Sequence, residues 1–223
     1  MKVVAIIPAR GGSVGILKKN IKLLNGKPLV AYAIETSLAS CADRTIVSTD
    51  SKEIAIVSKK YGAEVVIRPK ELSGSKTSSE VAILHVLESL KKQNYVPDIV
   101  VFLQCTTPLL DADTINKAVA MLSNGFDSVV SGCETFKYFW KRKDDAYFPI
   151  RPDRKMRQDM KPWFNENGGL YAAKYWVWNK TKSRYNGKIG IVLMPKENSF
   201  EIDTLFDFWL VEQILNYHSG CID

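Results

Sequence analysis

The chain has 223 residues, of which 46% are hydrophobic and 25% are charged. These fractions are typical of a globular protein and exclude disordered, collagen-like and disulfide-scaffold classes. A formal net charge of +7 suits an anionic ligand, which leaves a small anionic substrate, nucleic acid and an acidic membrane open at this stage.

Apolar runs of strand length alternate with stretches of helical period. In chain order the pattern predicts a strand over 2–7, a helix over 28–39, a strand over 45–48, a helix over 51–61, a strand over 64–67, a helix over 78–92, a strand over 98–104, a helix capped by Asp111 or Asp113 and ending near 123, and a strand over 128–133. Two further strands over 170–178 and 189–194 and a helix over 204–217 follow later. Strands that are hydrophobic on both faces and alternate with helices predict an α/β fold around a mostly parallel sheet.

This alternation breaks at residues 135–165, which we call the arm. Its first 29 residues, 135–163, contain nine Lys and Arg against four Asp, together with many aromatic residues and no clear period. The segment is too short for a core of its own and too aromatic for a solvated linker. We therefore expect the arm to pack on this molecule's own pocket or on a second subunit.

The cysteines and the lengths of the apolar runs bear on the cellular compartment of the protein. Four widely separated cysteines without metal-ligand spacing favour neither zinc nor disulfides. No stretch approaches about 18 apolar residues, the length of a membrane span. We expect a cytoplasmic protein with no membrane partner.

The first strand leads directly into a glycine-rich loop with the sequence PARGGSVGILKKN, residues 8–20. Consecutive glycines let backbone N–H groups approach an anion closely, and Arg10 and Lys19 add positive charge at each end. The spacing matches neither the dinucleotide-binding G-x-G-x-x-G nor the Walker G-x-x-x-x-G-K-[ST] pattern. It favours a triphosphate cradle over a generic turn.

This loop resembles the PARGGS-x-G-x-x-x-KN signature of the acylneuraminate cytidylyltransferases, the CMP-sialic acid synthetases. Five further blocks resemble that family in order: VSTD (47–50), RPKEL (68–72) with Ser78-Ser79, LQCTTPL (103–109), ENGGLY (166–171) and EIDTLFD (201–207). The resemblance implies a single nucleotidyltransferase-type, Rossmann-like three-layer domain over 1–223, with 135–165 as an inserted dimerisation arm. It also implies transfer of CMP from CTP to the anomeric hydroxyl of a sialic-type nonulosonic acid, a 2-keto sugar acid, with pyrophosphate released and Mg²⁺ or Mn²⁺ as cofactor.

The nucleotide site implied by the resemblance needs cations, because CTP carries several negative charges. Arg10 and Lys19 meet this need, and we expect them to be catalytic together with Asp203. The implied nucleotide-binding residues are Arg10, Gly11, Gly12, Ser13, Lys19, Asn20, Arg68, Ser78, Ser79 and Gln104. Since Gln104 and Arg10 each follow a predicted parallel strand, both should reach one crevice at the same sheet edge. The alternative for Gln104 is a strand-end residue that satisfies a loop backbone.

The resemblance assigns the sugar acid to Gln104, Asn167 and Tyr171. It also implies that Lys141 and Arg157 of the arm reach the site of the partner subunit in a homodimer. The alternatives are that Tyr171 is ordinary strand core and that the arm is a solvated basic loop.

Glu201 and Asp203 stand two residues apart before the last predicted helix. In extended chain this spacing points both carboxylates to the same side, where a hard cation could bind beside substrate phosphates. The family usually shows Asp-x-Asp here, and Glu201 retains an oxygen ligand. The alternative is that Glu201 or Asp203 caps the helix on which we expect Asp207.

Three positions depart from the family pattern: Val14 stands where Lys is usual, Ser75 where an acidic residue is common, and Leu110 where Arg is usual. Losing one loop cation costs about 1–3 kcal/mol of phosphate-site interaction. Two alternatives therefore stay open, a cytidylyltransferase for a related acid (pseudaminic, legionaminic or Kdo-like) and a nucleotide-binding relative with reduced turnover. Nucleic-acid binding by the aromatic arm is a third reading, and we expect no nucleic-acid partner.

Overall fold

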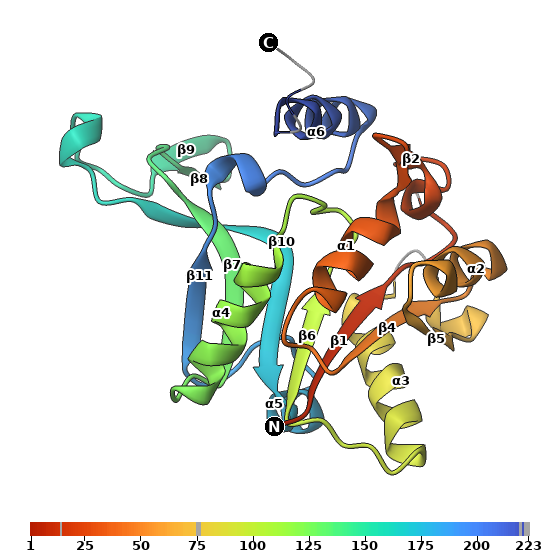
Figure 1. Ribbon diagram of the computed structural model, residues 1–223. Helices are drawn as coiled ribbons and strands as arrows, with labels where there is room; N and C mark the ends of the chain where they lie inside the picture. Colours follow the sequence, from red (N-terminus) through yellow and green to blue (C-terminus); the bar gives the residue numbers. More distant parts are fainter. Residues whose placement is uncertain (14, 75–76, 219, 221–223) are drawn as a thin grey trace.

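A computed structural model describes residues 1–13, 15–74, 77–218 and 220. Its centre is a seven-stranded sheet in the order β11-β7-β10-β6-β1-β4-β5 (Figure 1). The strands of this sheet are β1 (Val3–Pro8), β4 (Arg44–Thr49), β5 (Glu64–Ile67), β6 (Ile99–Leu103), β7 (Ser128–Thr135), β10 (Trp163–Lys174) and β11 (Ile189–Leu193). β10 runs antiparallel to β6 and β7, and the other pairs are parallel, which confirms the predicted mostly parallel sheet.

Helices cover both faces of the sheet. The helices are α1 (Leu29–Leu38), α2 (Lys52–Lys60), α3 (Ser79–Lys92), α4 (Ala112–Ser123), α5 (Tyr175–Thr181) and α6 (Leu205–His218). Alternate residues of β1 face opposite cores, because Val3, Ala5 and Ile7 pack with α1, α2 and α4 while Val4 and Ile6 pack with α3 and α5. Each fully buried Val or Ile contributes about 1.5–3 kcal/mol, so the doubly buried strands hold the three predicted layers together.

Most predicted elements are confirmed within a few residues, and Asp111 caps α4 by accepting a hydrogen bond from the Thr114 backbone N–H at 2.8 Å. The predicted strand over 170–178 is wrong at both ends. β10 begins earlier, at Trp163, and the chain turns into α5 at Tyr175. Aromatic and β-branched residues around Val177 favour strands locally, but burial of Val177 and Trp178 against α3 requires the helix.

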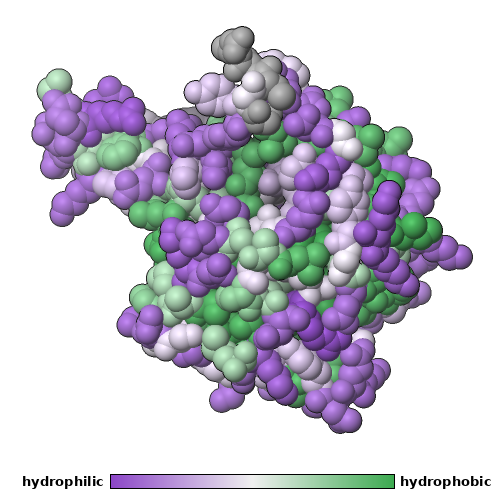
Figure 2. Space-filling view, in the orientation of Figure 1, coloured by the Kyte–Doolittle hydropathy of each residue, from purple (hydrophilic) through white to green (hydrophobic). Residues whose placement is uncertain are grey.

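The arm projects from the body beyond β7 (Figure 1). It contains the hairpin of β8 (Trp140–Lys143) and β9 (Ala146–Pro149) and a short 3-10 helix, η3 (Arg157–Asp159). Figure 2 shows it as a largely hydrophilic projection with hydrophobic side chains among the polar ones. Its exposed large hydrophobic residues are Phe139, Trp140, Tyr147, Phe148, Ile150 and Met156.

The remaining short elements are η1 (Lys19–Ile21), β2 (Leu23–Leu24), β3 (Lys27–Pro28), η2 (Lys70–Leu72) and η4 (Lys196–Asn198). Within the described part of the chain, no helix has the length and apolar character needed to cross a bilayer.

Candidate active site

A cavity of about 580 Å³ opens at the carboxyl ends of β1, β5 and β6. This is the sheet edge at which α/β proteins bind ligands. The structure brings ten of the predicted site residues to its walls: Arg10, Ser13, Lys19, Asn20, Arg68, Ser78, Ser79, Gln104, Glu201 and Asp203. Segments as far apart in sequence as the first strand and the approach to the last helix therefore meet at one site.

The glycine-rich loop is held by side chains on either side of it. The Gly11 backbone N–H donates to Asp50 Oδ1 at 2.8 Å, and Asn20 Nδ2 donates to the Arg10 carbonyl at 2.9 Å. A Cβ on Gly15 would lie 2.7 Å from the Asp203 carbonyl oxygen, so the loop packs directly on the segment before α6. Gly11 and Gly12 do not line the cavity, and their assignment to the nucleotide stays a prediction.

Arg68 is the most enclosed cation of the site. It follows β5, and only 5% of the residue is exposed. Burial, opposed by Asp50 and reinforced by Arg10, lowers the pKa of its guanidinium. Its Nε finds no hydrogen-bond partner among the described residues. A buried donor without a partner costs about 1–3 kcal/mol, so the fold holds this guanidinium at the cavity wall at a cost in stability.

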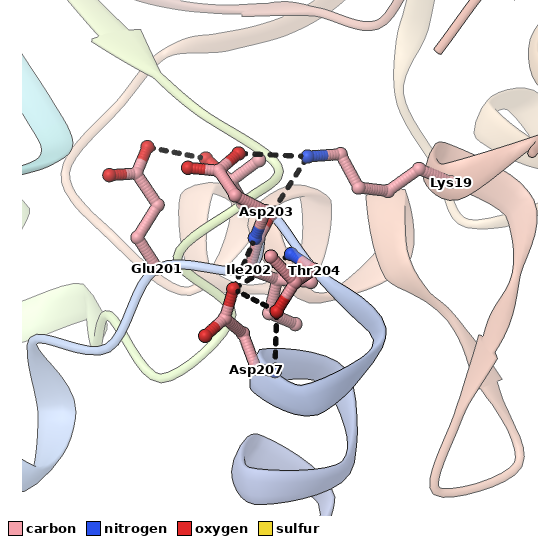
Figure 3. Close-up of polar contacts among 7 residues, drawn as sticks. Lys19, Glu201, Ile202, Asp203, Thr204 and Asp207 are labelled. Carbon is pink, nitrogen blue, oxygen red and sulfur yellow. Dashed lines mark hydrogen bonds and ion pairs between the residues drawn. The ribbon is translucent and has the colours of Figure 1, made fainter. Parts of the chain in front are cut away.

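Lys19 points toward Asp203, and Glu201 lies on the same segment two residues earlier (Figure 3). The Lys19 Nζ donates to the Ile202 carbonyl at 2.7 Å and to Asp203 Oδ1 at 3.2 Å. Glu201 Oε1 accepts from the Thr106 hydroxyl at 3.3 Å. Partial burial, followed by the charge of Asp203, raises the pKa of Glu201. Two carboxylates thus share one wall of the cavity with Lys19, an arrangement that a further cation would stabilise.

Neither Glu201 nor Asp203 caps α6. Figure 3 shows that Thr204 and Asp207 do so reciprocally, because the Thr204 backbone N–H donates to Asp207 Oδ2 at 2.7 Å and the Asp207 N–H donates to Thr204 Oγ1 at 3.2 Å. Asp207 lies on α6 as predicted. The capping alternative is therefore wrong, and both carboxylates remain available to the cavity.

The oxygen donors of Glu201 and Asp203 fit Mg²⁺, which proteins commonly hold through one or two carboxylates together with substrate phosphates. Among the described residues, no group of three or more His, Cys, Asp or Glu could hold a metal ion. Any divalent ion here would need oxygen atoms from a substrate to complete its coordination.

Gln104 lines the cavity and also supports the chain beneath it. Its Nε2 donates to the Gly168 carbonyl at 2.6 Å. The alternative that Gln104 bonds a loop backbone therefore describes one of its contacts, although the residue also lines the cavity. Gly168 has φ of +67°, and a Cβ there would lie 2.9 Å from Gln104 Nε2 and 3.1 Å from Glu201 Oε1. The glycine is needed both for its left-handed backbone and for this close approach.

Asn167 and Tyr171 do not line the cavity. Asn167 is 4% exposed, and its Nδ2 donates to Ser199 Oγ at 3.2 Å while its Oδ1 accepts from Ser131 Oγ at 2.8 Å. Tyr171 is 3% exposed and stacks on Phe102. Both residues are tied into the protein interior, and their sugar contacts remain predictions.

Lys141 and Arg157 lie exposed on the arm and do not line the cavity of their own chain. Arg157 sits 5.2 Å from the ring centroid of Phe136. Of the three departures from the family pattern, Val14 and Ser75 lie outside the described residues. Leu110 is 6% exposed and packs in the α1–α4 core, away from the cavity walls.

Seven residues that line the cavity were not among the predicted site residues: Pro8, Gly15, Thr77, Phe102, Cys105, Thr106 and Arg184. Cys105 and Thr106 lie inside the LQCTTPL block, which could have indicated them. Burial raises the pKa of the Cys105 thiol to about 12, so at neutral pH it is not the thiolate that nucleophilic catalysis requires. Arg184 follows α5 in a polar loop, and no sequence signal marks it.

The fold and the site together define an α/β protein with a ligand-sized cavity at the carboxyl ends of its parallel strands. The fold is similar to that of CMP:2-keto-3-deoxy-manno-octonic acid synthetase complexed with CTP, with a TM-score of 0.73 and 14% identity over 98% of this chain and 100% of that one. It is also similar to a 4-diphosphocytidyl-2C-methyl-D-erythritol synthase from Anaerococcus prevotii, with a TM-score of 0.70 and 17% identity over 96% of this chain and 98% of that one.

Sequence comparison identifies the family. The model of the family described as cytidylyltransferase matches residues 4–214. A pseudaminic acid cytidylyltransferase of Campylobacter jejuni is 31% identical over 93% of each chain. A CMP-N,N'-diacetyllegionaminic acid synthase of Legionella pneumophila is 33% identical over 100% of each, and an N-acylneuraminate cytidylyltransferase of Escherichia coli is 32% identical over 94% of this chain and 51% of its own. The chain belongs to the cytidylyltransferase family, which confirms the resemblance drawn from the sequence.

Proposed function

We propose that this protein transfers CMP from CTP to the anomeric hydroxyl of a nonulosonic acid. The proposal rests on two features of one cavity. The buried, incompletely bonded guanidinium of Arg68 suits a phosphate oxygen. The carboxylates of Glu201 and Asp203, which lie beside Lys19, suit a phosphate-bound cation. Named relatives at 31–33% identity act on nonulosonic acids, which supports the acceptor class.

In the proposed reaction the anomeric oxygen forms a bond to the α-phosphorus, the bond from that phosphorus to the oxygen leading to the β-phosphate breaks, and pyrophosphate leaves. The hydroxyl gives up its proton to solvent water. Arg10 and Lys19 stabilise the phosphate charge, and the glycine loop and Gln104 orient the reactants, so catalysis rests on positioning and electrostatics. Glu201 and Asp203 would hold Mg²⁺ or Mn²⁺, which when bound neutralises charge on the departing pyrophosphate.

The test is pyrophosphate release, with identification of the CMP-sugar, from CTP and Mg²⁺ with N-acetylneuraminic, pseudaminic, legionaminic and Kdo-type acids in turn. We propose the sialic-type acid as the substrate, and the relative kcat/KM values decide among the four. CTP binding without release for every acid would instead identify a nucleotide-binding relative that has lost turnover.

We also propose a homodimer in which the arm reaches the partner's site. Support comes from the arm's exposed aromatic and basic residues, none of which is among the residues lining the cavity of its own chain, and from the projection of the arm away from the body in Figure 1. Mixing Arg157→Ala with the inactive Asp203→Asn should restore activity, because one site of the mixed dimer would be intact. Two inactive variants that stay inactive after mixing and exchange would contradict shared sites.

A further inference from the structure

Among the described residues, Arg184 is the fourth arginine or lysine that lines the cavity, and it lies over strands β6 and β10. It lies in the loop between α5 and β11 and lines the wall. Its guanidinium lies 4.5 Å from the ring centroid of Tyr171 on β10 and 5.3 Å from that of Phe102 on β6. Arg10 follows β1 and Arg68 follows β5. In the strand order, β10 and β5 are four strands apart, or roughly 19 Å at the usual spacing.

Three neighbours fix the guanidinium in place. Glu80, in the first turn of α3, accepts from Arg184 Nε at 2.6 Å. The Tyr171 and Phe102 rings beneath it stack on each other, with centroids 5.3 Å apart and planes 24° apart. An arginine held over an aromatic pair and anchored through Nε is preorganised, so it loses little conformational entropy when its remaining N–H groups bind a ligand.

Arg184 has more N–H donors than the described residues have acceptors for them. A guanidinium has five N–H groups, and Glu80 takes the one on Nε. The Tyr171 hydroxyl, which donates to the Glu166 carboxylate, can accept one more. The terminal nitrogens therefore keep donors for a planar oxygen group, the type of group that a guanidinium binds best.

Other cations of the cavity already suit the triphosphate, because Arg10 and Arg68 follow β1 and β5 and Lys19 lies beside Asp203, whereas Arg184 lies over the rings of β6 and β10. We infer that Arg184, stacked on Tyr171 and anchored by Glu80, binds a carboxylate or amide oxygen of the acceptor acid and so helps to select it. The inference rests on the proposed function. In this arrangement Tyr171 positions Arg184 from below and does not itself contact the acceptor.

The test compares Arg184→Gln and Arg184→Lys with a matched control, Arg44→Gln. Arg44 also donates through Nε to a glutamate, Glu64 at 2.7 Å, and lies 4.7 Å from the Tyr95 ring centroid, but it does not line the cavity. The control thus loses the same kind of ion pair and stacking without touching the site.

Arg184→Gln should raise KM for the acid about 10- to 100-fold while KM for CTP stays within about twofold. Arg184→Lys should recover only part of the loss, because an ammonium lacks the planar fork. Arg44→Gln should leave both constants unchanged. With Arg184 intact, replacing the acid by its carboxamide, and separately by its de-N-acylated form, shows which oxygen is bound, because only the modification at the bound group reproduces the rise.

An unchanged KM for the acid in Arg184→Gln, or an equal rise for CTP, would overturn the inference while the proposed function stands. Calorimetric titration of the acid into CDP-loaded protein gives the same comparison without turnover. If wild-type protein neither releases pyrophosphate nor binds any acid, the proposed function and this inference fail together.

Discussion

The cavity and the arm are both basic, yet their positive charges are placed in different ways. In the cavity, Arg68 is buried at a strand end and Lys19 is bonded to the segment before α6. On the arm, Arg154 and Arg157 lie exposed over the rings of Tyr138 and Phe136. Fixed, desolvated cations stabilise a phosphate far more than mobile, hydrated ones. Each positive charge in the cavity therefore stabilises a bound phosphate more than the same charge on the arm does.

The sharpest test of the cavity side is Asp203→Asn. Removing one of two carboxylates proposed to hold the cation should lower kcat by about 100-fold or more, as loss of a transition-state electrostatic contact does. The fold should persist, because the Asp203 side chain is 69% exposed. Pyrophosphate release measures the effect, and circular dichroism checks the fold.

Asp113→Asn is the control for that variant, because Asp113 also pairs with a lysine, Lys117 at 2.7 Å, on an exposed surface. It should leave turnover unchanged. Near-normal activity of Asp203→Asn would remove this carboxylate from the proposed cation site.

Substituting one arginine in each region compares the cavity directly with the arm. Arg68→Met should raise KM for CTP about 10- to 100-fold through the loss of charged hydrogen bonds. It should also raise the melting temperature of the ligand-free protein, because the variant no longer buries an incompletely bonded guanidinium. Arg142→Gln on the arm should change neither value. Thermal unfolding with and without CTP, together with CTP kinetics, checks both, and equal losses in the two variants would erase the distinction.

Gly168→Ala tests how closely the cavity floor is packed. The positive φ and the contact with Gln104 should together cost about 2 kcal/mol of unfolding free energy. Gly125→Ala isolates the backbone term, because Gly125 has φ of +94° and no atom within 4 Å of the added Cβ. Urea unfolding should show the larger loss at Gly168, and equal losses would contradict the close approach.

The smallest expected effect is on titration. The pKa of Glu201 should lie above the ordinary value of about 4.3, and Asp203→Asn should lower it only in part, because burial is the larger cause. Since the folded state holds this proton more tightly than the unfolded chain, ionising Glu201 reduces stability as pH rises through the raised pKa. Carboxyl NMR titration of the two proteins measures the shift, and identical pKa values would exclude coupling between the pair.

Sequence patterns predicted the cavity well where its residues follow strands. Arg10, Arg68 and Gln104 each come directly after a parallel strand, so hydrophobic periodicity together with sheet geometry places them at one edge. Asn167 and Tyr171 belong to β10, which runs antiparallel to β6. Their side chains are buried in the protein interior. Local pattern does not determine which way a neighbouring strand runs.

The sequence by itself determined the alternating α/β organisation, the glycine-rich loop and the family, because hydrophobic period and short motifs are properties of neighbouring residues. Only the tertiary structure decided that Tyr175 begins a helix and that Arg184 reaches the cavity. The Arg184–Glu80 pair spans 104 positions of the chain, and its geometry depends on how α3, β6 and β10 pack together. Such contacts exist only once the whole sheet has formed, since no local preference encodes them.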